Sequence, residues 1–197
     1  MTDFVAAGSF AELAKRVIYN NEKDYAQLVR TTDLKSNFTK SEMVYVSKDA
    51  YDFLWRVKLD KDCIVLPNIG VNCGEVYFVT HKKMPYEHNV LGPNAILVNS
   101  SSVSIKYLYY YFCGKDFQKK LHKIISPAGQ TKFNKTDLKK LPIFVPPLEE
   151  QERIVAILDR FDALCNDLAS GLPAEIEARK KQYEYYRDKL LTFKEAV

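Results

Sequence analysis

The sequence predicts an α+β fold, in which a mixed α/β domain over residues 1–147 is followed by a C-terminal helical arm, an antiparallel coiled coil, over residues 148–197. Two observations support this prediction. Short β-rich segments punctuated by glycine and asparagine recur through the first part, whereas apolar residues at heptad spacing mark the end. Three prolines between residues 142 and 147 separate the two patterns. With 197 residues, 47% of them hydrophobic, the chain can bury a core without metal or disulfide support.

In the first part, β-rich runs predict extended segments at residues 43–46, 63–66, 75–80, 94–99 and 143–145. Two helices are predicted at residues 103–112 and 115–124, with Gly114 between them. The aromatic run in the first of these helices is expected to pack in the core rather than to stack on bases. Tight turns or close backbone approach are expected at residues 67–70 and 72–74, where glycine and asparagine cluster.

The proline-rich segment predicts the boundary between the domain and the arm. Proline has no amide donor and disfavours helix in the residue before it, so residues 141–147 should be extended. Glu149 and Glu150 then place negative charge at the positive end of a starting helix. Apolar residues follow at spacings of four and three, which is a heptad seam that faces a partner helix.

A second helix is predicted from Pro173 to about Lys194, after a stop at Gly171. One alternative is that both helices pack on their own domain. The other, which we favour, is packing against a partner, because two helices have little of their own to cover such stripes. The residues predicted to pair helices are Ile154, Leu158, Phe161, Leu168, Ile176, Tyr183, Tyr186 and Leu190.

Charge is distributed unevenly along the chain. Residues 1–147 carry 21 Lys and Arg against 14 Asp and Glu, while residues 148–197 carry 8 against 11. The basic excess of the first part is expected if it contacts a polyanion. The sequence has no apolar run long enough to cross a bilayer and no secretion-signal layout at its start, so we expect a cytoplasmic protein that contacts no membrane.

The strongest candidate for contact with a polyanion is the basic stretch from residue 119 to residue 140, which has seven lysines and one acid. Its centre must be a loop, because Pro127 and Gly129 oppose a helix. Lysines neutralise phosphates, while Gln and Asn can pair bidentately with adenine. A solvated loop is the alternative. The residues predicted here to bind DNA are Gln130, Lys132, Asn134 and Lys135.

A second candidate is the polar run that follows Leu28 and Val29. The planar fork of Arg30 matches the two acceptors of guanine, but an Arg30–Asp33 structural pair is an equal alternative. Lys82 and Lys83 in a loop are predicted to contact phosphate. The remaining predicted DNA-binding residues are Thr31, Thr32, Lys35, Asn37, Asn68 and Asn72.

Motifs for catalysis are missing from the sequence. The only Pro-Pro, at residues 146–147, lacks the preceding amide or acid and the following aromatic residue that hold a flipped adenine. No glycine-rich nucleotide loop is present. The four cysteines and three histidines are scattered, so they predict reduced, buried thiols and no metal site. The sequence therefore predicts a non-catalytic protein without a cofactor.

Residues 146–155 and 157–164 (PPLEEQERIV and ILDRFDAL) resemble the conserved region of Type I restriction-modification specificity subunits. Residues 171–191 resemble its continuation, and residues 62–79 and 129–145 resemble the target recognition domains of that family. The resemblance implies a sequence-specific DNA-binding subunit that reads one half of a bipartite site in double-stranded DNA.

The same resemblance implies two partner subunits: a methyltransferase subunit that uses S-adenosylmethionine and a DNA-translocating restriction subunit. The family pattern has two recognition domains and two helical regions, and this sequence has one of each. It is therefore expected to pair with a second copy of itself or with a second recognition domain of a longer chain. Two identical readers would recognise a palindromic, interrupted site. The alternative function is a coiled-coil protein-interaction scaffold that reads no DNA.

Overall fold

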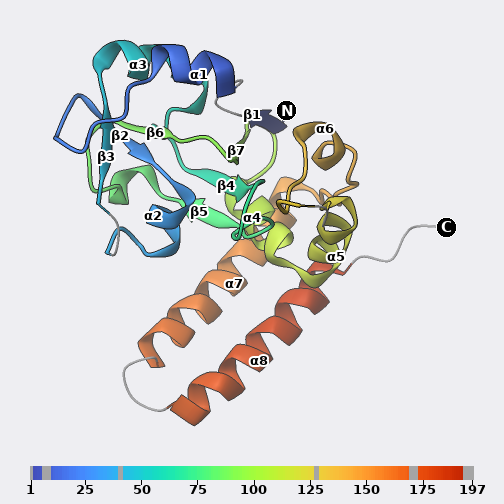
Figure 1. Cartoon of the computed structure of the whole chain (residues 1–197). Helices are drawn as coiled ribbons and strands as arrows, with labels where there is room; N and C mark the ends of the chain where they lie inside the picture. The colour runs from blue at the N-terminus through green and yellow to red at the C-terminus, as the bar shows by residue number, and fades with distance from the viewer. Residues whose placement is uncertain (1, 6–9, 40–41, 127–128, 169–172, 193–197) are drawn as a thin grey trace.

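The computed structural model describes residues 2–5, 10–39, 42–126, 129–168 and 173–192. It confirms the α+β fold class: two small sheets and several helices form a head, and two long helices project from it (Figure 1).

The first sheet has the strand order β1 (Thr2–Val5), β7 (Ala95–Ser100), β4 (Cys63–Pro67) and β5 (Tyr77–Val79), and all its neighbouring strands are antiparallel. Ile64 pairs with Val98, and Val65 pairs with Leu97. Because successive side chains alternate between the faces of a strand, each pair lies on the opposite face from the other. Ile64 and Val98 belong to one hydrophobic core and Val65 and Leu97 to a second. The sheet therefore separates two cores.

The second sheet has the order β3 (Val44–Val46), β2 (Ala26–Val29) and β6 (Asn89–Leu91), with β3 antiparallel and β6 parallel to β2. Around it lie α1 (Phe10–Arg16), α2 (Thr31–Lys35), α3 (Lys48–Phe53) and the 3-10 helix η1 (Trp55–Val57). All four residues of β2 are buried. The last of them, Val29, leads directly to Arg30 and α2, so this buried strand fixes the start of the polar run.

The other core lies between the first sheet and the helices α4 (Ile105–Cys113), α5 (Lys115–Ile124) and α6 (Lys135–Leu138). Tyr107 and Phe112 are fully buried there, so the aromatic run of α4 is core, as predicted. Gly114 separates α4 from α5. A Cβ atom at Gly114 would lie 3.1 Å from the carbonyl oxygen of Tyr111, so the chain has little room for a side chain at this junction.

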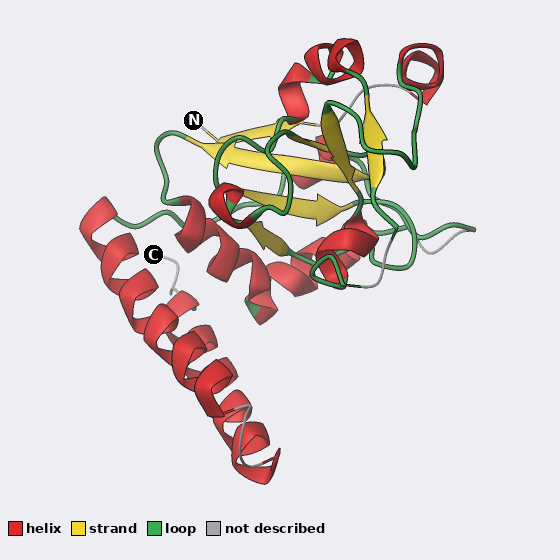
Figure 2. Cartoon of the chain, turned by 90° about the vertical axis from the view of Figure 1, so that its left-hand side faces the viewer, coloured by secondary structure: helices red, strands yellow, loops and turns green. Residues whose placement is uncertain are grey.

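The arm consists of α7 (Leu148–Leu168) and α8 (Pro173–Leu191), which run side by side away from the head (Figures 1 and 2). Ile154 and Leu158 are fully buried in the core that contains α4. These two residues therefore pack on the domain of their own chain, which was the alternative to packing against a partner. Farther along the arm, the rings of Phe161 and Tyr186 stack with centroids 5.8 Å apart.

Polar contacts also fix the arm to the head. Asp159 of α7 accepts hydrogen bonds from Lys106 Nζ at 2.6 Å and from the Tyr110 hydroxyl at 2.5 Å. The side chain of buried Gln151 accepts from the Ser104 amide at 2.8 Å and donates to the Pro146 carbonyl at 2.8 Å. The first turns of α7 therefore belong to the head, and the rest of the arm extends beyond it.

The other residues predicted to pair helices divide into two groups. Tyr183 and Leu190 pack against the core that contains α4. The side chains of Leu168 and Ile176, and the predicted stop at Gly171, lie outside the described residues. The described part of the second helix ends at Leu191, three residues before the predicted end.

One predicted β segment is wrong. Residues 143–145 form no strand. Instead, the Phe144 carbonyl accepts from the Tyr107 hydroxyl at 2.9 Å, and the Phe144 amide donates to the Tyr111 hydroxyl at 3.3 Å. Tyrosines of α4 thus take the hydrogen-bonding groups that a sheet would have used. The prolines on either side, which have no amide donor, also oppose a ladder.

Candidate nucleic-acid interface

A hollow of about 460 Å³ opens on the head where several segments of the chain meet. They include the residues just before β2, the N-terminal end of α2, the loop between β4 and β5, and the segments that flank Asn94 and Gln130. The polar residues that line the hollow are Asn21, Arg30, Thr31, Thr32, Asn72, Asn94 and Gln130. Five of these seven were predicted from the sequence to bind DNA.

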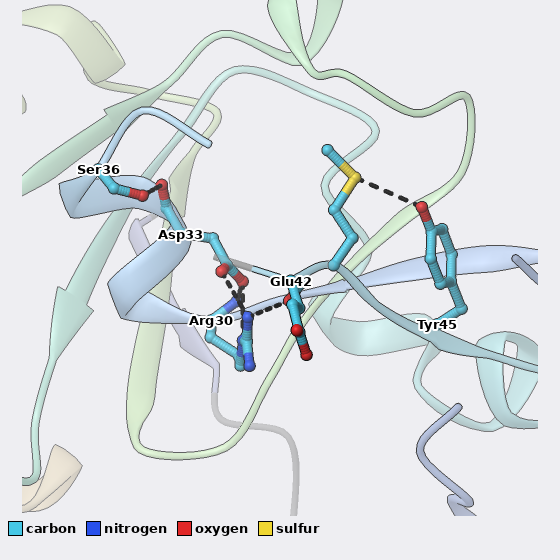
Figure 3. Close-up of polar contacts among 6 residues, drawn as sticks. Arg30, Asp33, Ser36, Glu42 and Tyr45 are labelled. Carbon is cyan, nitrogen blue, oxygen red and sulfur yellow. Dashed lines mark hydrogen bonds and ion pairs between the residues drawn. The ribbon is translucent and has the colours of Figure 1, made fainter. Parts of the chain in front are cut away.

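Arg30 lies at the N-terminal end of α2, beside the hollow, and is held by two groups (Figure 3). Its Nε and Nη2 atoms donate to the two carboxylate oxygens of Asp33 at 3.1 and 2.8 Å, and Nη2 also donates to the Glu42 carbonyl at 2.6 Å. The Asp33 side chain is 1% exposed, whereas that of Arg30 is 37% exposed. The pKa of Arg30 is raised, chiefly by its hydrogen bond with Asp33.

These contacts use three of the five N–H groups of the Arg30 guanidinium. The two N–H groups of Nη1 take part in none of them. The Arg30–Asp33 pair expected as one alternative is therefore present. It does not exclude base reading, because the two N–H groups of Nη1 remain as donors for an acceptor on a base.

The loop between β4 and β5 is ordered by its own backbone. The Gly74 amide donates to the Pro67 carbonyl, and the Cys73 amide donates to the Gly70 carbonyl, each at 3.0 Å. Gly70 has a φ of 94° and Gly74 a φ of 91°, a backbone region that residues other than glycine rarely adopt. The turns predicted at residues 67–74 are therefore present, with their glycines in the conformation that glycine favours.

A second segment joins this loop. The Gly70 amide donates to the Thr131 carbonyl at 2.9 Å, and the side-chain amide of Asn68 donates to the Phe133 carbonyl at 3.1 Å. Gln130 and Lys132 are exposed on the joined segment. The structure thus brings together two regions that were predicted separately from the sequence. Asn68 helps to connect them, which gives it a structural role within the head.

Two more predicted residues have clear structural roles. Asn134 is the N-cap of α6: its Oδ1 accepts from the Asp137 amide at 2.8 Å, and its Nδ2 donates to the Asp137 carboxylate at 2.7 Å. Lys35 donates to Asn72 Oδ1 at 3.0 Å and to a Glu75 carboxylate oxygen at 2.6 Å. Lys35 therefore connects α2 to the loop between β4 and β5.

Asn37 and Lys83 lie elsewhere, beside a smaller hollow of about 150 Å³. Its lining also includes Leu34 of α2, so α2 connects the two hollows. Lys82 and Lys83 are exposed on the 3-10 helix η2 (His81–Lys83), where the His81 amide donates to Asp62 at 3.0 Å. Lys135 is exposed on α6. The predicted lysines are therefore exposed on the head but do not line the main hollow.

The residues of the main hollow that sequence reasoning missed include Tyr19, Asn21, Val71 and Asn94. Two of these residues, Asn94 and Val71, have features in the sequence that could have indicated them. Asn94 follows Gly92-Pro93 and has a φ of 69°, a turn conformation that asparagine tolerates. Val71 is an apolar residue inside a turn-forming segment. Tyr19 and Asn21 fall in a polar stretch without periodicity, and only the fold brings them to the hollow.

Two properties of the described part of the chain bear on its class. None of its helices combines the length and apolar character needed to cross a bilayer. Within the same residues, no three His, Cys, Asp or Glu side chains gather in a way that could hold a metal ion.

The head and its paired helices have a counterpart among solved structures. A chain from work on complex assembly and conformational transition of the type I R-M system superposes with a TM-score of 0.60 at 18% identity, over 96% of this chain and 43% of that one. This likeness defines the class of fold: an α+β head carried on a helical arm.

Similarity in sequence gives the family. Residues 7–178 match the family described as the Type I restriction modification DNA specificity domain. The chain is 40% identical over 99 residues to the EcoR124I/EcoR124II specificity subunit of Escherichia coli, which is 49% of this chain and 24% of that protein. It is 46% identical over 66 residues to the MpnII specificity subunit of Mycoplasma pneumoniae, which is 34% of this chain and 20% of that protein.

The chain belongs to the Type I restriction modification DNA specificity domain family. These matches span about a quarter or less of the two curated relatives.

Proposed function

We propose that this chain selects the DNA sequence on which a type I restriction-modification complex acts, and that its head reads one half of a bipartite site. The observation that carries the proposal is the clamped Arg30 fork beside the hollow that Gln130 also lines. The Nη1 group of Arg30 can donate to an acceptor on the edge of guanine, and an amide side chain can pair bidentately with adenine. Membership of the DNA specificity domain family supports the same function.

In this proposal, sequence reading and general attraction to DNA belong to different residues. Arg30, Thr31, Thr32 and Gln130 line the hollow and supply the donors and acceptors that distinguish bases. Lys82, Lys83, Lys132 and Lys135 are exposed on the head and contact phosphates, which position the duplex without reading it. Asn68, Asn72 and Asn134 act within the head, because their amides are used in its internal hydrogen bonds.

The arm, residues 148–197, supplies the second half of the site by pairing with another arm. A 21-residue helix such as α7 is about 32 Å long at 1.5 Å per residue, close to one turn of DNA. The exposed apolar side chains of the arm, among them Leu164 of α7 at 50% and Tyr185 of α8 at 60%, are available to a second copy or to a second recognition domain of a longer chain. Two identical heads would read a palindromic, interrupted sequence.

The chemistry in this proposal belongs to other subunits. A methyltransferase subunit holds S-adenosylmethionine and modifies the DNA, and a restriction subunit translocates and cleaves it. The chain itself needs no cofactor and works in the cytoplasm, where the DNA is.

The direct test is a titration of the full chain, with the methyltransferase subunit present, against a duplex that carries its site and a duplex that does not. Affinity for the site should exceed affinity for the competitor by at least about a thousandfold. The logarithm of affinity should fall with the logarithm of salt concentration at about −0.9 per phosphate contact, or roughly −5 for six contacts. Dimerisation without any duplex binding would instead identify an interaction scaffold and refute the proposal.

Removing the charges of Lys82 and Lys83 together should weaken binding to both duplexes by the same factor, because phosphate contacts carry no sequence information. The salt slope should become shallower by about 2. The double alanine variant is to be compared with Lys180→Ala/Lys181→Ala, which removes two exposed lysines from the arm. A loss confined to the duplex that carries the site would show that the two lysines read bases.

A further inference from the structure

Val71 is placed unusually for a valine. Its side chain is 98% exposed, at the tip of the ordered loop between β4 and β5. The loop is held on both sides of Val71, because the Gly70 amide donates to the Thr131 carbonyl and the Glu75 amide donates to the Asn72 carbonyl, at 2.9 and 3.1 Å. The side chain of Asn72 is tied in turn to Lys35 at 3.0 Å. A β-branched side chain with few rotamers is thus presented to solvent from a backbone that is already ordered.

Gln130 lies next to the same loop. A Cβ atom added to Gly70 would lie 3.9 Å from Nε2 of Gln130, which places this amide beside the residue that precedes Val71. Gln130 is exposed, so its side-chain amide can reach a ligand in solvent. Both residues line the hollow, together with Arg30.

We propose that Val71 and Gln130 together read one adenine–thymine step of the DNA half-site, an inference that rests on the proposed function. In the major groove adenine offers an acceptor at N7 and a donor at N6, which match the NH₂ and the oxygen of a glutamine amide. Thymine offers a C5 methyl group, which favours an apolar contact. An apolar tip beside an exposed amide therefore fits an A·T pair, or two adjacent A·T pairs.

The combination fits the other bases less well. At guanine, both major-groove positions are acceptors, so the oxygen of Gln130 would face another oxygen. Cytosine presents an amino group and no methyl group, so Val71 would have nothing apolar to contact. Phosphate contact is excluded for Val71, which has no donor.

The experiment has two stages. First, the wild-type full chain, with the methyltransferase subunit present, selects duplexes from a randomised library, and sequencing gives the enriched motif. Then, at each A·T pair of that motif, thymine is replaced by uracil, which lacks the methyl group, or adenine is replaced by 7-deazaadenine, which lacks the N7 acceptor. Dissociation constants are measured for the wild type, Val71→Ala, Gln130→Ala and the control Val145→Ala, whose valine is 45% exposed before α7.

At one A·T step, uracil should weaken wild-type binding about fourfold, the factor that corresponds to one methyl group removed from water. At that step or the adjacent one, 7-deazaadenine should weaken it about tenfold. Val71→Ala, which removes both γ-methyl groups, should reduce the uracil effect alone, and Gln130→Ala should abolish the 7-deazaadenine effect alone. Val145→Ala should keep both. Since both reading residues are exposed, thermal melting should be the same for all variants.

The outcomes separate the two levels of the proposal. An enriched motif whose analogue effects persist unchanged in Val71→Ala and Gln130→Ala overturns the joint reading and leaves the proposed function intact. If the wild type enriches no motif, both are overturned.

Discussion

Replacing Leu158 with alanine is expected to lower the free energy of unfolding by about 2–5 kcal/mol, the range for a leucine truncated in a packed core. The side chain is fully buried between α7 and the head, in the same core as Tyr107 and Phe112. Truncation removes its contacts and leaves a cavity that the surrounding aromatic residues cannot easily fill. Urea denaturation followed by circular dichroism measures the change.

Leu148→Ala is the matched control, because Leu148 lies on the same helix, is 57% exposed and is not among the residues proposed to pair two arms. It should cost much less, within about 0.5 kcal/mol of the wild type as for an ordinary surface site. Equal losses for the two variants would contradict the placement of Leu158 in the core of the head. The sequence alone predicted that Leu158 pairs helices. The structure instead predicts that an acidic substitution there would unfold the head, since a lone buried charge is costly.

Arg30→Lys is expected to weaken the sequence preference while leaving the protein folded and equally charged. Lysine keeps the positive charge near Asp33 but loses the planar guanidinium, and with it the Nη1 donors that Asp33 and Glu42 leave unused. Specific affinity should fall by about 10- to 150-fold, which corresponds to about 1.5–3 kcal/mol for a hydrogen bond from a charged donor. Affinity for a duplex without the site should hardly change. Competition binding measures the affinity for the duplex that carries the site and the affinity for the duplex that does not.

Arg153→Lys is the control for this substitution. Arg153 makes the same kind of fork, donating through Nε and Nη2 to the two Glu150 oxygens at 2.7 Å each, but it lies on α7 outside the hollow. That variant should keep the full preference. Should Arg30→Lys retain the wild-type ratio of the two affinities, Arg30 serves only to hold Asp33, and the base-reading role proposed for it is wrong.

Periodicity in the sequence predicted the long elements well, for a physical reason. A heptad stripe over twenty residues is compatible only with a helix that buries one side, so α7 and α8 could be placed within a few residues. The same stripe says nothing about what covers it. Ile154 and Leu158 are covered by α4, a helix more than forty residues earlier in the chain, and only the tertiary structure shows this.

Short elements and the roles of single polar residues were harder to predict. Four- or five-residue helices such as α2 and α6 carry too few apolar positions to show a period. Asn134 was predicted to bind DNA because of its amide, yet Asp137 three residues later marks it as a helix cap. The hollow itself depends on the pairing of residues 69 and 132, which lie far apart in the sequence.

The most direct test is to map methylated positions across the genome of cells that carry this chain and of cells from which its gene has been deleted. We predict a split motif, two short specified blocks separated by a gap of fixed length, that is methylated only when the chain is present. If the blocks are inverted copies of one another, two identical heads read them. The same methylated positions in both strains would contradict the claim that this chain selects the DNA sequence.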